Sequence, residues 1–379
     1  MEKKRYANID LLKTLAILMV IALHSQLFKL DFIQNNNISS YIQYFFRIIC
    51  EGVAIFILVN GYLVINKKEF DLKKHLLKTL KIFAILILWS VILTIGTKLI
   101  YNEQLKISEI IKNIFITDIN NKYTGVLWFL QSLISLYLIY PIIKIVHDKE
   151  PKVYNYLFVV ILIFTMGCNL LNLISDLINT KIECNTINLI TTYISKFQIL
   201  YNRNFLIFFL LGGYLFENKE KFEDKKIRIK WIIIGITSWV IAFIFAVITS
   251  KLQNKTYMQN FSYGSIFMPL ILIGIFAATY NYKSKEKWYN KIIETISKNS
   301  LGIYLIHIII IRIVNSIYTE QLSLTFRIVK VITVLTLSLI ITLIIRKIPK
   351  VKKIIELWFE LMNIIPICNR KKFLTSLWH

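Results

Sequence analysis

The first apolar segment carries three side chains that could do chemistry. Residues 8–28, NIDLLKTLAILMVIALHSQLF, hold Asp10, Lys13 and His24 in an otherwise apolar run. In a membrane-spanning helix each charged group costs about 2.5–3.5 kcal/mol on insertion scales. From Lys13 to His24 a helix turns by about 1,100°, so both lie on one stripe, about 16 Å apart along the axis. Three polar groups on one face predict that this face lies inside a helix bundle.

Each of these residues has a structural explanation beside the chemical one. Lys13 near a helix end can snorkel to the headgroups, and Asp10 lies one turn away, close enough for an ion pair. His24 can form an interhelical hydrogen bond and do no more. As a chemical group, a neutral imidazole accepts a proton near physiological pH. The chemical hypothesis is that His24 is a general base.

The second apolar segment, FFRIICEGVAIFILVNGYLVIN, adds a carboxylate. Arg47 and Glu51 are four residues apart and share a face if the helix is continuous. Antiparallel neighbouring helices would bring Glu51 to the depth of His24, where it could orient the imidazole; the alternative is a structural Arg47–Glu51 ion pair. Asn60 is expected level with Lys13, beside a glycine that allows close backbone approach.

Ten apolar blocks must position these groups. The chain has 379 residues, of which 56% are hydrophobic, and Lys- and Asn-rich segments separate blocks of about 20 residues. The predicted fold class is an all-α polytopic membrane protein with one ten-helix domain over 1–346. The basic amphipathic segment 347–379 is expected to lie on the inner membrane surface. The predicted helices span 8–28, 45–65, 82–100, 125–145, 154–175, 203–217, 231–250, 262–281, 299–317 and 325–345.

Basic residues indicate the orientation. With the N-terminus inside, the inside segments hold several times as many Lys and Arg residues as the outside loops. Both termini are therefore predicted to be cytoplasmic, in the plasma or inner membrane. The net charge of +24 is spread over many segments, which indicates anionic lipid and argues against a nucleic-acid partner. The four cysteines lack metal-ligand spacing, so no metal site is predicted.

The ninth predicted helix carries a second polar stripe. Ser300, Tyr304 and His307 follow one another at spacings of four and three, and therefore share a face. The stripe could contact a substrate, or its members could pack and hydrogen-bond locally.

Aromatic and basic residues near helix ends are weaker candidates. Trp128, Tyr137 and Tyr140 suit an interfacial aromatic belt better than a substrate site. Arg203 and Arg312, expected at outer helix ends, could hold an anionic glycan or snorkel to the headgroups.

Four motifs resemble the membrane-bound acyltransferase family 3, especially its cell-surface polysaccharide O-acetyltransferases and O-succinyltransferases. They are IDLLKTLAILMVIALH, EGVAIFILVNGYLV, LWFLQSLISLYLIYP and ISKNSLGIYLIH. The first resembles the family pattern of an acid, then a basic residue, ten residues and His. Lys13 stands where the family often has Arg, and Asn60 where it usually has Ser. The Arg-x-x-Arg element of some branches has no counterpart in NKKEFDLKKHLLK.

The resemblance implies acyl transfer from cytoplasmic acyl-CoA, such as acetyl-CoA or succinyl-CoA, to a hydroxyl of a cell-surface or lipid-linked glycan. The Lys-lined inner face suits the CoA phosphates, and the 16 Å stripe implies that donor or acceptor reaches through the bundle or that a residue is acylated in between. The catalytic candidates are His24, Glu51, Lys13 and Asp10. The donor-binding candidates are Lys13, Asn60 and Ser300. The acceptor-binding candidates are Arg47, Trp128, Tyr304, His307, Arg203 and Arg312.

Two other classes of function stay open. A transporter or flippase would also place polar residues among ten helices, and a sensing domain would bind a ligand without turnover. A transporter predicts inverted repeats or broken helices with paired Gly or Pro interruptions, and the sequence shows neither clearly. Release of free CoA from acyl-CoA would distinguish the classes.

Overall fold

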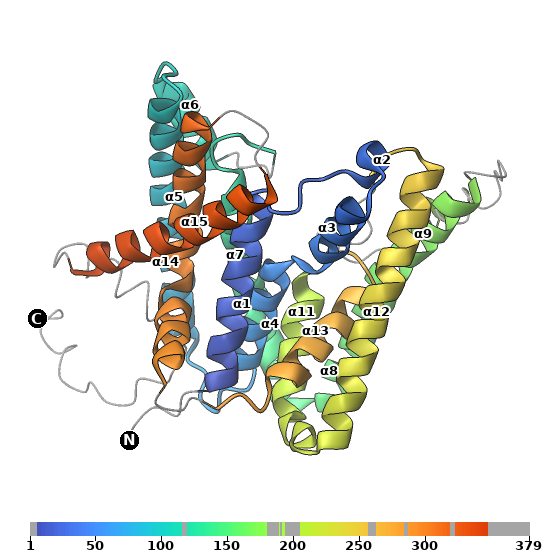
Figure 1. The fold of residues 1–379 in the computed structure, drawn as a ribbon. Helices are drawn as coiled ribbons and strands as arrows, with labels where there is room; N and C mark the ends of the chain where they lie inside the picture. The colour runs from blue at the N-terminus through green and yellow to red at the C-terminus, as the bar shows by residue number, and fades with distance from the viewer. Residues whose placement is uncertain are drawn as a thin grey trace, which may run out of the picture.

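The computed structural model describes residues 6–115, 120–179, 205–256, 263–283, 287–318 and 323–347, together with residues 189, 192 and 193. Over these ranges the chain is helical and contains no strand (Figure 1). The predicted tail 347–379 lies outside them except for Lys347, and so does Arg203.

Eight helical segments in the described ranges are long and apolar enough to cross a membrane. Two shorter apolar helices, α11 (Phe205–Glu217) and α13 (Phe267–Thr279), bring the total close to the predicted ten. The all-α polytopic fold class is therefore confirmed. The eight segments are α1 (Ala7–His24), α3 with α4 (Ile38–Ile49 and Gly52–Val64), α5 (Leu72–Ile100), η1 with α7 (Gly125–Leu127 and Trp128–Lys149), α8 with η2 and α9 (Pro151–Ile161, Leu162–Gly167 and Cys168–Asn179), α12 (Lys225–Leu252), α14 (Trp288–Ile317) and α15 (Leu324–Lys347). The remaining short elements are α2 (Phe32–Asn35), α6 (Ile107–Phe115) and η3 (Lys219–Glu223).

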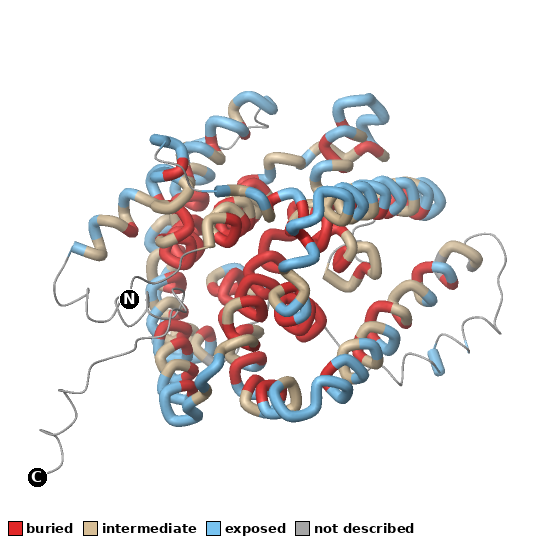
Figure 2. Tube along the Cα trace, turned by 90° about the horizontal axis from the view of Figure 1, so that it is seen from below, coloured by how far each residue is buried: buried red, intermediate tan, exposed pale blue. Residues whose placement is uncertain are grey.

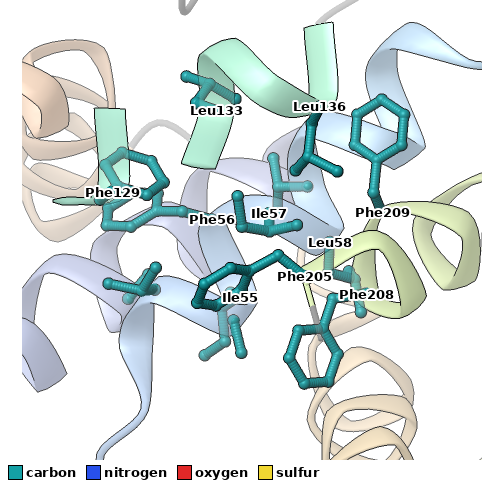
Figure 3. Packing of buried hydrophobic residues seen from close by; sticks show 14 of the residues in the cluster. Ile55, Phe56, Ile57, Leu58, Phe129, Leu133, Leu136, Phe205, Phe208 and Phe209 are labelled. Carbon is teal, nitrogen blue, oxygen red and sulfur yellow. The ribbon is translucent and has the colours of Figure 1, made fainter. Parts of the chain in front are cut away.

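The core surrounds α4, which is buried along nearly its whole length. Figure 3 shows its side chains Ile55, Phe56, Ile57 and Leu58 between residues of α7 and α11. A helix that is buried on all sides has no side turned to lipid or to water. The α4 helix is therefore the central helix of the bundle.

The outer helices turn apolar side chains outward. Figure 2 shows buried residues gathered in the interior and exposed ones along the outer helices. Large exposed apolar surfaces in a water-soluble chain would mark an interaction site, whereas here they recur along several long helices, as expected where lipid surrounds the protein. Examples are Leu80 and Leu88 on α5, Ile236 and Ile244 on α12, and Ile332 and Ile340 on α15.

The second predicted helix is broken, which corrects the expectation of one helix over 45–65. It begins earlier, at Ile38, ends at Ile49, and starts again at Gly52. Cys50 and Glu51 lie between the two parts, so Arg47 and Glu51 do not share a face of one continuous helix. The absence of broken helices expected from the sequence is therefore wrong at this point.

The helices α1 and α14 run parallel and side by side (Figure 1). Near their N-terminal halves the Ser297 hydroxyl donates to an Asp10 carboxylate oxygen over 2.6 Å, and the Thr14 hydroxyl donates to the Ile293 carbonyl over 3.1 Å. The α15 helix crosses both at a steep angle in Figure 1. These contacts fix the register between the first-helix stripe and the ninth-helix stripe.

Candidate active site

The stripe predicted on the first helix is present. Lys13 is buried and His24 is half-buried, at opposite ends of α1. Asp10 is bonded to Ser297 across the α1–α14 contact, so it supports the helix packing. Lys13 is buried inside the protein, so its side chain does not extend to the lipid headgroups in this structure.

The ring that lies beside His24 is that of His307. The two imidazoles, one on α1 and one on α14, have centroids 5.2 Å apart and planes tilted by 59°. His307 is fully buried, and its Nδ1 is hydrogen-bonded to the backbone carbonyl oxygen of Tyr304 one turn earlier. The polar stripes of the two helices therefore meet in an imidazole pair.

Glu51 lies at the break before α4, next to a glycine that packs on α1. Its neighbour Gly52 lies against α1 at Ala16 and Met19, where an added Cβ would come 2.1 Å from the Ala16 carbonyl oxygen and 3.1 Å from the Met19 Cβ. Met19 precedes His24 by five residues, or about 7.5 Å along a helix axis. The break before α4 thus places the backbone of Glu51 nearer the middle of α1 than the end that carries His24.

Arg312 lies near the imidazole pair on the next turns of α14. It is buried, and it donates to the Thr97 hydroxyl and to the carbonyl oxygens of Lys122 and Tyr123, the latter over 3.0 Å. Its guanidinium interacts electrostatically with both His24 and His307. Arg312 therefore does not extend to the headgroups. Its guanidinium is hydrogen-bonded to uncharged oxygens and places a positive charge near the two imidazole rings.

Other polar contacts hold the surroundings of the pair. The Tyr304 hydroxyl donates to the Val126 carbonyl over 2.5 Å and its ring packs on Phe129, so this residue joins α14 to the start of α7. On α15, Arg327 donates to the Gln26 carbonyl over 3.3 Å. The first bond holds α14 near His307, and the second holds the chain just after His24.

A second cluster, of three lysines, lies toward the N-terminal end of α1. Lys78 on α5 lies within electrostatic range of Lys67 and of Lys13, so basic residues from three segments lie around Lys78. Burial lowers the pKa of Lys67, which lies between α4 and α5. Like charges that lie close together raise the local positive potential, and such a potential attracts an anionic ligand. We call Lys13, Lys67 and Lys78 the lysine cluster.

Tyr137 on α7 contacts both Asn60 and Lys78, a member of the lysine cluster. The side-chain amide of Asn60 donates to the Phe56 carbonyl over 2.8 Å and its oxygen accepts from the Tyr137 hydroxyl over 3.0 Å. Lys78 lies 5.1 Å from the centre of the Tyr137 ring, and His75 is hydrogen-bonded to the Tyr137 carbonyl over 2.6 Å. Sequence reasoning assigned Lys67, His75 and Lys78 to an inside loop, because the predicted third helix began at 82, whereas α5 begins at Leu72.

The aromatic-belt interpretation of α7 is wrong. Trp128 is buried and stacks on Phe205 with ring centroids 5.3 Å apart, and the Tyr140 hydroxyl donates to the Val64 carbonyl over 2.8 Å. Tyr137 is buried as well. These rings are packed inside the protein, so they do not form an exposed belt. Ser300 is also buried, and its hydroxyl has no hydrogen-bond partner within the described part of the chain.

The described residues contain no group of three or more His, Cys, Asp or Glu side chains arranged to hold a metal ion. The two clusters that form around the first-helix candidates Lys13 and His24 are a group of lysines, and an imidazole pair with a nearby guanidinium. The first can bind an anion and the second can move a proton.

Comparison with protein families identifies the chain. A family model described as "Acyltransferase domain", that of acyltransferase family 3, matches residues 6–346. The match covers nearly the whole chain, so the protein belongs to this family of membrane acyltransferases. No curated protein and no solved structure shows significant similarity to it.

Proposed function

We propose that this member of acyltransferase family 3 moves an acetyl or succinyl group from cytoplasmic acyl-CoA to a hydroxyl of a cell-surface or lipid-linked glycan. One observation carries the proposal: a single helix, α1, contributes Lys13 to a lysine cluster near one end and His24 to an imidazole pair at the other. An anion-binding group and a proton-accepting group on one stripe are what transfer from a phosphate-bearing donor requires.

The lysine cluster is proposed to bind the donor. CoA carries several phosphates, and three converging lysines supply the charge to hold them from the cytoplasmic side. Asn60 lies beside the cluster and is proposed to position the donor, and Ser300 on α14 has a buried hydroxyl that could meet the pantetheine arm. That long, flexible arm would carry the thioester along α1 toward His24.

At the other end, His24 is proposed to act as the general base. It takes the proton from the acceptor hydroxyl while the hydroxyl oxygen bonds to the thioester carbonyl carbon. The carbon–sulfur bond then breaks, the ester forms, and the departing sulfur receives the proton to give free CoA. The charge of Arg312 near both rings is suited to stabilise the oxyanion between these steps.

The acceptor is proposed to approach the imidazole pair from the outer side. His24 is only half-buried, so it is the more accessible member of the pair. Tyr304 and Trp128 are committed to packing and to backbone contacts, and their proposed part in acceptor binding is to shape this end of the bundle. Arg47, half-buried on α3, remains a proposed contact for an anionic glycan.

The test is turnover of purified protein in lipid nanodiscs with acetyl-CoA or succinyl-CoA, with lipid extract from the producing cells as the acceptor. Release of free CoA thiol is expected to depend on the extract. His24→Ala should lower the rate by about 10²–10⁴-fold, the usual cost of losing a general base. Glu51→Gln should cost less, because it spares the base. Wild-type protein that releases no CoA with either donor would contradict the proposal.

Transport is the second candidate, and the break at Cys50 and Glu51 is the observation that favours it. Discontinuous helices line substrate sites in transporters. Uptake of labelled acyl-CoA or glycan lipid into vesicles without thiol release would support this alternative.

A further inference from the structure

Within the described part of the chain, one of the two nitrogens of His307 has a hydrogen-bond partner. Nδ1 is hydrogen-bonded to the Tyr304 carbonyl oxygen. A carbonyl only accepts, so Nδ1 must carry the hydrogen, and in the neutral ring Nε2 then carries the lone pair. Nε2 is buried and has no hydrogen-bond partner within the described part of the chain. A buried acceptor without a partner is costly, and this one lies next to a second imidazole.

The separation of the two rings suits a direct hydrogen bond between them. A ring nitrogen lies about 1.2 Å from its ring centre, and an N–H···N bond spans about 2.9 Å, so the centres of two bonded imidazoles lie about 5.2–5.3 Å apart. The observed separation of the His24 and His307 centroids is 5.2 Å. A direct hydrogen bond at this separation requires a His24 ring nitrogen to point at Nε2 of His307.

We propose that His24 and His307 form an imidazole dyad in which Nε2 of His307 accepts a hydrogen bond from the N–H of His24. His307 is then a positioning residue: it sets the tautomer of His24, so that the other His24 nitrogen faces the acceptor hydroxyl with its lone pair. This is the part that sequence reasoning gave to Glu51. The dyad rests on the proposed function for its chemical meaning, and on the geometry of the two rings for its existence.

Two substitutions at one position separate positioning from packing. In His307→Asn the side-chain amide can still donate to the Tyr304 carbonyl, as Nδ1 does, but nothing replaces Nε2. In His307→Gln the longer side chain places its carbonyl oxygen near the former Nε2, where it can accept from His24. Thermal unfolding and CoA binding, measured on both variants, report whether either substitution disturbs the fold or the donor site.

The dyad predicts that His307→Asn lowers kcat by about 10–100-fold, as when the group that orients a metal-bound histidine is removed, with little change in KM for acyl-CoA. His307→Gln should recover most of that loss. Equal rates in the two folded variants, whether both high or both low, would overturn the dyad while leaving the acyltransferase proposal intact.

A spectroscopic measurement tests the dyad without turnover, and therefore stays decisive if wild-type protein releases no CoA or if both variants unfold. In ¹⁵N-histidine-labelled wild-type protein, His307 should show a protonated Nδ1 and an unprotonated Nε2 that accepts a hydrogen bond. The other tautomer, or an Nε2 with the shift of a nitrogen free of any hydrogen bond, would refute the proposal. His75→Gln, a second buried histidine, assigns the remaining buried signal.

Discussion

Gly61 on α4 lies directly against the backbone of Phe209 on α11: a Cβ built on Gly61 would come 1.9 Å from the Phe209 carbonyl oxygen. The contact is reciprocal, because a Cβ on Gly212 of α11 would come 2.0 Å from the Leu58 carbonyl oxygen. Small residues facing each other let two membrane helices approach closely. This contact holds the central helix, and with it Asn60, in place.

Gly61→Ala should therefore destabilise the protein. The added methyl group meets backbone atoms that cannot rotate away, and overpacking costs about 1–3 kcal/mol or more. Thermal unfolding in detergent measures the loss. Gly96→Ala on α5 is the matched control, since nothing lies within 4 Å of its added Cβ and alanine gains up to about 1 kcal/mol of helix propensity. Equal melting temperatures for the two variants would show that the α4–α11 contact is looser than described.

Lys78→Ala should weaken acyl-CoA binding, because it removes one of the three charges of the lysine cluster. A hydrogen bond to a charged group contributes about 1.5–3 kcal/mol, so Kd should rise by about tenfold or more. The dependence of Kd on salt should become shallower, since fewer phosphate contacts remain to be screened. Isothermal titration in nanodiscs gives both quantities.

Lys74→Ala is the control for this prediction. Lys74 lies on the same helix, one turn earlier, but it is exposed and pairs with Asp71 over 3.1 Å. Donor binding should stay close to wild type in this variant. An equal loss in both variants would indicate general attraction by the basic surface and would remove the lysine cluster as a specific site.

Low pH should destabilise the segment around Lys122 and Tyr123, whose carbonyl oxygens accept hydrogen bonds from Arg312. Hydrogen bonds from Lys122 and Tyr123 hold the pKa of Glu103 below its usual range. A lowered carboxyl pKa contributes stability above its unfolded value, about 4.3, and that stability is lost as the pH falls through the folded pKa. Wild-type protein should therefore lose more thermal stability between pH 7 and acid pH than Glu103→Gln does. The difference should be small, since the pair is solvent-exposed, and identical pH dependences would contradict the network.

The proposed orientation predicts which surface sites can be labelled. After replacement of the native cysteines by serine, cysteines at the exposed positions Asn36 and Asn254 should react with an impermeant thiol reagent added to intact cells. A cysteine at Lys225, which is also exposed, should react only after lysis. The reverse pattern would place the lysine cluster on the outer side and exclude cytoplasmic acyl-CoA as its ligand.

The amino-acid sequence alone was enough to predict the fold class and the polar stripe on each of two helices. Apolar blocks of bilayer length form membrane helices, because lipid offers no hydrogen-bond partners and a helix pairs its backbone N–H and C=O groups within one segment. Helical periodicity then puts Lys13 and His24 on one stripe, and Ser300, Tyr304 and His307 on another, since positions within a single helix follow from residue spacing. Both stripes are buried or half-buried in the structure, as predicted.

What only the tertiary structure decided is how separate helices meet. Residue spacing within one helix does not predict the close approach of Gly52 to Ala16 or the break at Cys50, and these two features place the backbone that follows Glu51 against the middle of α1. The parallel packing of α1 on α14 brings His307 to His24. Likewise, α5 begins ten residues earlier than the predicted 82, at Leu72, because tertiary contacts of His75 and Lys78 with Tyr137 accommodate polar residues that composition assigns to a loop. Contacts between residues far apart in the chain depend on packing, and packing is decided by the shapes of whole helices.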